Sequence, residues 1–212
     1  MTTVIDRLSE LGVLPVAEIE RVDQAGRLVD TLARAGLPCI EVTLRTPVAA
    51  EAIQLIRTRR PDVLVGAGTV LTVQDVDVAL DSGAQFLVSP GLNPGVVAHG
   101  QRRGATFIPG VCTPTEVEAA VSAGASVLKF FPAELAGGIP FLKALAAPYP
   151  MVRFIPTGGI DATNLGAYLE LPNVVACGGT WMVRRSLIAT DDFATIGRLA
   201  AEAATIGATR VR

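Results

Sequence analysis

A lysine interrupts an otherwise apolar segment in the second half of the chain. In the stretch ASVLKFFPAE, Lys129 lies within Val127–Phe131, whose other side chains are all apolar. The chain has 18 basic residues, and only two of them, Lys129 and Lys143, are lysines. Burial disfavours the charged form of lysine, and the uncharged amine is the group that proteins use for Schiff-base chemistry. Lys129 is therefore a candidate nucleophile. A lysine that reaches the surface or pairs with a carboxylate is the alternative.

An acid and a base share a second apolar segment, CIEVTLR, at Cys39–Arg45. Alternate residues of a strand point to the same face, so Glu41, Thr43 and Arg45 should point together. A guanidinium matches a carboxylate in bidentate geometry, which makes Arg45 a candidate clamp for a substrate carboxylate. Glu41 can add and remove the protons that an amine nucleophile requires. A structural ion pair between Glu41 and Arg45 is the alternative.

Two glycine pairs occur late in the chain, in PTGGI (Pro156–Ile160) and CGGT (Cys177–Thr180). Exposed backbone N–H groups of such loops, beside helix N-termini, form sites for anions such as phosphate. An amine nucleophile, a proton carrier, a carboxylate clamp and a phosphate site together indicate a Schiff-base lyase that acts on a phosphorylated keto acid. Such a reaction needs no metal, because the protonated imine is itself the electron sink.

Short apolar runs alternate with amphipathic segments along the whole chain. The runs are nearly continuous in hydrophobicity, which is typical of parallel strands buried on both faces. The expected strands are Val13–Ile19, Cys39–Arg45, Leu64–Thr69, Phe86–Pro90, Thr106–Val111, Val127–Pro132, Arg153–Thr157 and Val174–Gly178. Helices are expected at Asp23–Ala35, Val48–Arg60, Val73–Ser82 and Pro114–Ala123, among others.

Eight strand–helix units in 212 residues predict a single (β/α)8 barrel domain over residues 1–212. A doubly wound open sheet is the rival, but the segment after the first strand, PVAEIERVD, lacks the glycine-rich turn of that fold. Val4–Leu11 should form an additional N-terminal helix that caps the bottom of the barrel or makes an oligomer contact. The C-terminal ends of barrel strands form the active face, and all three candidate groups lie at such ends. On the strand that contains Lys129, Val127 and Phe131 should face the barrel interior with it.

The composition argues against several other classes of protein. A net charge of −2 and 5% aromatic residues do not favour nucleic acid as a partner. No apolar run approaches the ~20 residues of a membrane span, and the N-terminus lacks the apolar core of a signal peptide, so a cytoplasmic protein is expected. Three scattered cysteines and the single His99 provide no disulfide framework or zinc motif. We therefore expect neither a metal nor a cofactor.

Six motifs in order along the chain resemble those of the 2-keto-3-deoxy-6-phosphogluconate (KDPG) aldolases. They are EVTLRT (Glu41–Thr46), VGAGTVL (Val65–Leu71), SPG (Ser89–Gly91), KFFPAE (Lys129–Glu134), PTGGI (Pro156–Ile160) and GGTW (Gly178–Trp181). The resemblance covers nearly the whole chain. It implies a metal-independent class I aldolase that cleaves KDPG to pyruvate and glyceraldehyde 3-phosphate. It also implies a homotrimer, and in many members activity on 4-hydroxy-2-oxoglutarate.

The resemblance also implies roles for individual residues. Lys129 would form the Schiff base, and Glu41 would be the proton donor and acceptor. The residues that would contact the pyruvate half are Arg45, Thr69, Pro90 and Thr157, with Phe131 as a wall of the lysine pocket. Those that would hold the phosphate are Gly158, Gly159, Gly178, Gly179 and Thr180. Many relatives have serine where this chain has Thr180, which keeps the hydroxyl.

Three alternative functions are weighed against this one. The TLRT motif favours the gluconate substrate over its galactonate epimer. A sugar-phosphate epimerase or isomerase would need histidines or a metal at the strand ends, and His99 does not lie at one. A catalytically silent barrel that binds a phosphorylated keto acid would have no use for a buried lysine and glutamate, which are costly to bury.

Overall fold

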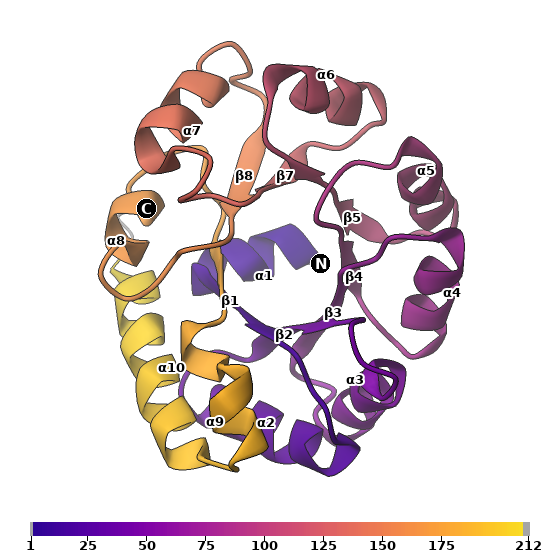
Figure 1. The fold of residues 1–212 in the computed structure, drawn as a ribbon, viewed down its shortest axis with the longest axis vertical. Helices are drawn as coiled ribbons and strands as arrows, with labels where there is room; N and C mark the ends of the chain where they lie inside the picture. Colours follow the sequence, from indigo (N-terminus) through magenta and orange to yellow (C-terminus); the bar gives the residue numbers. More distant parts are fainter. Residues whose placement is uncertain (1, 210–212) are drawn as a thin grey trace.

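Helices surround a ring of parallel strands in the computed structural model, which describes residues 2–209 (Figure 1). The strands are β1 (Val13–Ala17), β2 (Cys39–Thr43), β3 (Leu64–Gly68), β4 (Phe86–Val88), β5 (Thr106–Ile108), β6 (Gly110–Val111), β7 (Val127–Phe130), β8 (Arg153–Pro156) and β9 (Cys177–Gly179). Each lies within a segment predicted from its apolar run, except that the last strand begins at Cys177, three residues later than expected, and ends at Gly179, one residue later.

The strands close into a barrel in the order β5-β4-β3-β2-β1-β9 and β6-β7-β8. Only Pro109 separates β5 from β6; a proline has no N–H to donate, but its carbonyl still accepts a hydrogen bond from the Lys129 N–H at 2.9 Å. On the other side, the bridge between Thr157 and Gly178 joins β8 to β9. With β5 and β6 as one interrupted strand, the barrel has eight positions, and the predicted (β/α)8 fold is confirmed.

All the helices except α1 pack around the outside of this barrel (Figure 1). The helices are α1 (Val4–Leu11), α2 (Val22–Arg34), α3 (Ala49–Arg59), α4 (Val73–Asp81), α5 (Pro94–Arg102), α6 (Pro114–Ser122), α7 (Gly138–Ala146), α8 (Leu165–Leu169), α9 (Arg185–Ala189) and α10 (Phe193–Ala208), with the 3-10 helix η1 (Trp181–Val183). Capping residues fix the starts of α4 and α6, since the side chains of Thr72 and Thr113 accept hydrogen bonds from the first turns of these helices.

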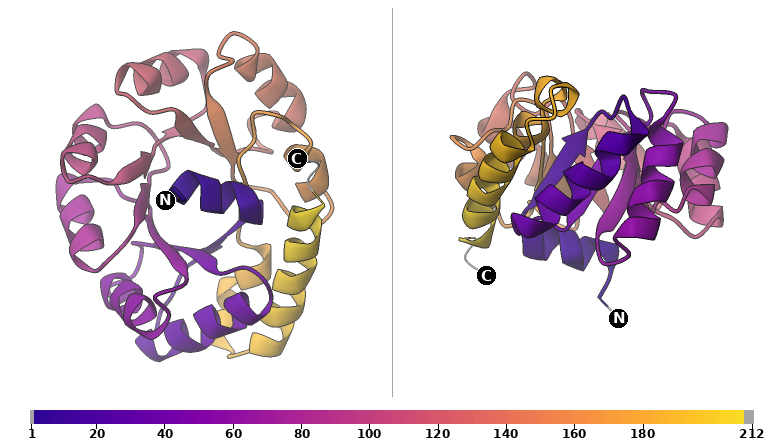
Figure 2. Two further views of the ribbon diagram at one scale, coloured as in Figure 1. Left: turned by 180° about the vertical axis from the view of Figure 1, so that it is seen from behind. Right: turned by 90° about the horizontal axis from the view of Figure 1, so that it is seen from below.

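The first helix, α1, closes one end of the barrel instead of joining the outer ring (Figure 2). Its Leu8 is fully buried in a cluster with side chains from the barrel interior, among them Leu14, Leu64 and Phe86. Polar residues on its other side stay exposed, as an amphipathic helix requires. The lower part of the barrel is therefore a sealed apolar core, and the predicted capping role of Val4–Leu11 is confirmed.

Among residues 2–209, no helix is both long enough and apolar enough to cross a membrane. The same part of the chain contains no cluster of three or more histidine, cysteine or acidic side chains that could hold a metal ion.

Candidate active site

A pocket of about 340 Å³ opens at the C-terminal ends of the strands. Every site residue predicted from the sequence lines it, from Glu41 within β2 to Thr180 directly after β9. The predicted residues in its lining are Glu41, Arg45, Thr69, Pro90, Lys129, Phe131, Thr157, Gly158, Gly159, Gly178, Gly179 and Thr180. Closure of the barrel thus brings together residues up to 139 positions apart in the sequence.

Lys129 projects from β7 into the barrel interior and is 7% exposed. Its neighbours Leu128 and Phe130 point the other way and belong to the core between strands and helices. The Lys129 Nζ lies 5.3 Å from the centre of the Phe131 ring. The strand alternation predicted from the sequence is therefore correct, and the amine stands at the base of the pocket, shielded from water.

Glu41 faces this amine from β2. Its Oε1 lies 3.6 Å from the Lys129 Nζ, and its side chain is 2% exposed. Among the residues described, no group donates a hydrogen bond to Oε1. Space for the carboxylate comes from Gly68 of β3, where a Cβ would lie 2.0 Å from Oε1. A buried carboxylate with an unused oxygen beside an amine is placed to accept and return a proton.

Arg45 lies at the rim of the pocket, just beyond the end of β2, with 56% of its side chain exposed. It pairs with Glu18 at 3.6 Å, from Nη1 to Oε2, whereas Glu41 pairs with Lys129. The alternative interpretation of Glu41 and Arg45 as a structural ion pair is therefore wrong. The exposed guanidinium remains available to an anion that enters the pocket.

Thr69, Pro90 and Thr157 form walls between these charged groups. Thr69 has a φ of 59°, a left-handed conformation that is rare for a β-branched residue. Such strain persists only where the surrounding structure imposes it, and it is concentrated at functional sites. Here the Val70 N–H donates to the carbonyl of Val88 at 3.1 Å and holds the turn in place.

The two glycine pairs meet on one side of the pocket. Gly158 and Gly159 have φ values of 99° and 80°, which favour glycine. A Cβ on Gly178 would lie 2.4 Å from the Oγ1 of Thr157, so the two loops approach closely. We expected each glycine loop to lie beside the N-terminus of a helix. Backbone N–H groups are present, but the helices that directly follow the two loops are short, since α8 has five residues and η1 only three.

Three charged residues of the pocket were not predicted: Glu18, Arg184 and Arg185. Glu18 lies just past the end of β1, and its Oε1 pairs with the Arg185 Nε at 3.6 Å. The two arginines follow η1, within six residues of the end of β9. The strand-end rule would have found them had it been applied to the first strand and extended past the last glycine pair.

A buried lysine paired with a carboxylate, inside a (β/α)8 barrel with an arginine and two glycine loops at its mouth, defines a Schiff-base barrel enzyme. The chain belongs to the KDPG and KHG aldolase family, whose model matches residues 4–199.

Known aldolases are similar to this chain over nearly their full length. The 2-dehydro-3-deoxy-phosphogluconate aldolase of Treponema pallidum is 52% identical over 199 residues, which cover 94% of this chain and 95% of the relative. The KDPG aldolase of Zymomonas mobilis ZM4, solved with 3-phosphoglycerate, is 40% identical, with a TM-score of 0.91 and coverage of 100% of both chains. That of Legionella pneumophila, with pyruvate captured as a covalent carbinolamine, is 39% identical, with a TM-score of 0.89 and coverage of 93% and 96%.

Proposed function

We propose that this protein is a class I aldolase that cleaves 2-dehydro-3-deoxy-6-phosphogluconate to pyruvate and glyceraldehyde 3-phosphate through a Schiff base on Lys129. The observation that carries this proposal is the buried Lys129–Glu41 pair at 3.6 Å, in which the carboxylate oxygen has no other partner among residues 2–209. Burying such a pair costs free energy, which a catalytic role explains. The carbinolamine captured in the Legionella pneumophila relative supports the same chemistry.

Imine formation is the first step. The uncharged Lys129 amine attacks the C2 carbonyl carbon of the keto acid; its nitrogen then loses a proton and the carbonyl oxygen takes one up, which gives a carbinolamine. A second proton transfer to that hydroxyl allows water to leave, and the nitrogen lone pair forms a double bond to C2, which gives a protonated imine. Both proton transfers to oxygen occur at the atom bonded to C2, the carbon that Lys129 holds. Glu41 lies within reach of this position, since its Oε1 is 3.6 Å from the Lys129 Nζ.

Cleavage follows from the charge on the imine. Removal of the proton from the C4 hydroxyl breaks the C3–C4 bond, and the electron pair moves through C3 and C2 to the imine nitrogen. The C4–C6 fragment leaves as glyceraldehyde 3-phosphate. Glu41 returns a proton to C3 of the enamine, and water then releases pyruvate from Lys129. No redox partner is consumed.

The rest of the pocket orients the substrate. Arg45, at the rim, would clamp the carboxylate of the pyruvate half, with Thr69, Pro90 and Thr157 as its walls and Phe131 beside the imine. The glycine loops, Gly158–Gly159 and Gly178–Gly179, and Thr180 would receive the phosphate through backbone N–H groups and the hydroxyl. The reacting carbons then lie between the two anchors, above Lys129.

The same site can take 4-hydroxy-2-oxoglutarate, which presents the same keto acid head and a shorter tail. We place the enzyme in the cytoplasm, where its free cysteines remain reduced. We also propose that residues 1–212 form one domain and that three copies assemble. Such a trimer would cover exposed apolar side chains such as Leu71.

Borohydride trapping with pyruvate, followed by peptide mass spectrometry, tests the nucleophile. Wild-type protein should carry a reduced pyruvyl adduct on Lys129. Lys129→Arg keeps the charge but cannot form an imine, so it should lose both the adduct and KDPG cleavage. Lys143→Arg is the matched control, because it changes the one other lysine of the chain, which is exposed on α7.

Three outcomes would contradict the proposal. An adduct on Lys143 would place the chemistry elsewhere, and cleavage that survives in Lys129→Arg would remove the imine mechanism. A wild-type protein that binds the keto acid without any adduct would be a silent binder. Comparison of kcat/KM for the gluconate and galactonate epimers would show which of the two is the substrate.

A further inference from the structure

Three arginines border the pocket, and they differ in whether an acidic side chain neutralises them. Arg45 pairs with Glu18 at 3.6 Å. Arg185 pairs with the same Glu18 at 3.6 Å and also with Glu20. Within the described part of the chain, Arg184 makes no ion pair within 4 Å, although it lines the same pocket. One unneutralised guanidinium therefore lies at the pocket wall.

Arg184 lies on the side where the glycine loops meet. It follows η1 on the loop after β9, across from the loop after β8. The pKa of Asp161, on that opposite loop, is lowered mainly by hydrogen bonds from Thr163, with a smaller contribution from the Arg184 charge. Asp161 accepts hydrogen bonds from the Thr163 N–H at 2.8 Å and Oγ1 at 2.6 Å. Asp161 thus directs its Oδ1 to Thr163, and among the described residues it forms no ion pair with Arg184 within 4 Å, which leaves the guanidinium donors open to a ligand.

Positive charge from a side chain would strengthen phosphate binding in this place. The favourable potential at a helix N-terminus comes from many aligned peptide dipoles. Here α8 has five residues and η1 has three, so neither can contribute much. The backbone N–H groups of the glycine loops are neutral donors, whereas a phosphate dianion is bound most strongly by a guanidinium in bidentate geometry. Arg184 supplies the missing charge.

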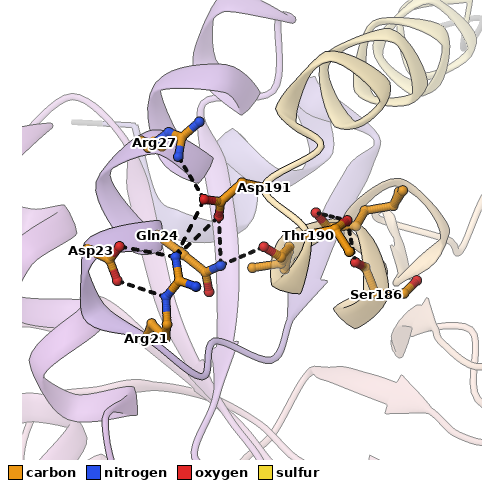
Figure 3. Close-up of polar contacts among 9 residues, drawn as sticks. Arg21, Asp23, Gln24, Arg27, Ser186, Thr190 and Asp191 are labelled. Atoms are coloured by element: carbon orange, nitrogen blue, oxygen red, sulfur yellow. Dashed lines mark hydrogen bonds and ion pairs between the residues drawn. The ribbon is translucent and has the colours of Figure 1, made fainter.

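Side chains of α2, Gln24 and Arg27, hold Asp191 at the end of the segment that contains α9 (Figure 3). The buried Gln24 donates from Nε2 to the carbonyl of Ile188 in α9 at 2.6 Å and to Asp191 at 2.8 Å. Arg27 pairs with the same Asp191 at 3.1 Å. Because α9 starts directly after Arg184, these contacts fix the position of its backbone while its side chain stays exposed.

We propose that Arg184 binds the substrate phosphate and determines the preference of this enzyme for phosphorylated keto acids. This inference rests on the proposed aldolase function. Arg184 adds charge to the backbone contacts of the glycine loops. As a ligand of the phosphate and not of the carbons that Lys129 holds, it affects substrate saturation and not the bond-breaking step.

Steady-state kinetics of Arg184→Gln on KDPG test the inference. Loss of a charge-assisted hydrogen bond should raise the KM for KDPG about tenfold, with little change in kcat. The inhibition constant of inorganic phosphate should rise by a similar factor. The pyruvate concentration that gives half-maximal borohydride trapping should stay at the wild-type value, because pyruvate has no phosphate. Arg184→Lys should give an intermediate KM, since lysine keeps the charge without the bidentate geometry. Arg102→Gln, an exposed arginine in the last turn of α5, is the matched control.

Two results would overturn the inference. An unchanged KM and an unchanged phosphate inhibition constant in Arg184→Gln would show that the backbone loops suffice. An equal loss for pyruvate and for KDPG would show a general distortion of the pocket. If the wild-type protein fails to cleave KDPG, the proposed function fails. Binding of inorganic phosphate to wild type and Arg184→Gln, measured by calorimetry, would then still decide the role of Arg184.

Discussion

Replacement of Gly68 by alanine should displace the proton carrier without touching the nucleophile. Gly68 is the last residue of β3, and its φ lies outside the left-handed region, so its backbone accepts alanine. A Cβ there would lie 2.0 Å from Oε1 of Glu41 and 2.7 Å from its Cγ and Cδ. Since ordinary contact begins near 3.4 Å, Oε1 must move by 1.4 Å. The carboxylate is 2% exposed and cannot swing into solvent without rearrangement of its surroundings.

The size of this shift sets the expected loss of activity. The Glu41–Lys129 distance is 3.6 Å, so a movement of 1.4 Å is a large part of the gap that a proton must cross. A misplacement of about 1 Å at a reacting group can cost roughly 10²-fold in rate. We therefore expect kcat for KDPG to fall about 10²-fold in Gly68→Ala. The inserted methyl should cost about 1–3 kcal/mol of folding free energy.

Stopped-flow or coupled assays of KDPG cleavage and chemical denaturation of the same samples would measure both effects. Gly91→Ala is the matched control, because a Cβ there would meet nothing within 4 Å. It should keep wild-type kcat and stability. Glu41→Gln should reproduce the kinetic loss, and the double variant with Gly68→Ala should lose little more, since both changes remove the same group.

Wild-type kcat in a folded Gly68→Ala protein would refute the reasoning, because it would show that the position of the Glu41 carboxylate does not limit the reaction. Additive losses in the double variant would do the same. They would mean that Gly68 acts through another group.

Three further results are expected. Thr69→Gly should raise folding stability by up to about 1 kcal/mol in denaturation, because it relieves the φ of 59°, but it should weaken pyruvate trapping. Iodoacetamide should label the half-buried Cys112 and spare Cys39, since burial raises the pKa of the Cys39 thiol to about 12; early labelling of Cys39 would contradict this burial. The hydrogen bond from Arg59 lowers the pKa of Asp30, so Asp30→Asn should destabilise the protein by roughly 0.2–1 kcal/mol at neutral pH. This difference should fade as pH falls below about 4 in urea titrations, since the depressed pKa stabilises the fold only when the carboxylate is ionised.

Local patterns in the sequence were sufficient to predict most of the fold. Apolar runs of strand length separated by amphipathic segments predicted the strand positions, and four helices lie within one residue of their expected ends. The interruption at Pro109 was not predicted, because a proline in an apolar run does not reveal whether its neighbours continue the ladder. The late start of the last strand at Cys177 was missed for a similar reason, since Val174 is apolar but forms only a single bridge.

Strand alternation also predicted the side-chain directions that matter for the site. The odd positions of β2 and β7 do face the barrel interior, so Glu41 and Lys129 were correctly expected to meet. The ion pairs themselves could not be predicted, because two carboxylates, those of Glu18 and Glu41, are candidate partners for Arg45. Its distance to Glu18 depends on the register between β1 and β2, which residue types do not encode.

The sequence by itself therefore determined the barrel, the nucleophile candidate and its likeness to a family, because each depends on residue type and on spacing within one element. The tertiary structure decided which side chains are neutralised. Arg184 and Arg185 are adjacent in the chain, yet one is paired with Glu18 and the other is unpaired among residues 2–209. That difference arises from the closure of the barrel, which brings β1 beside β9. A charge balance between segments about 165 residues apart exists only once the strands between them have folded.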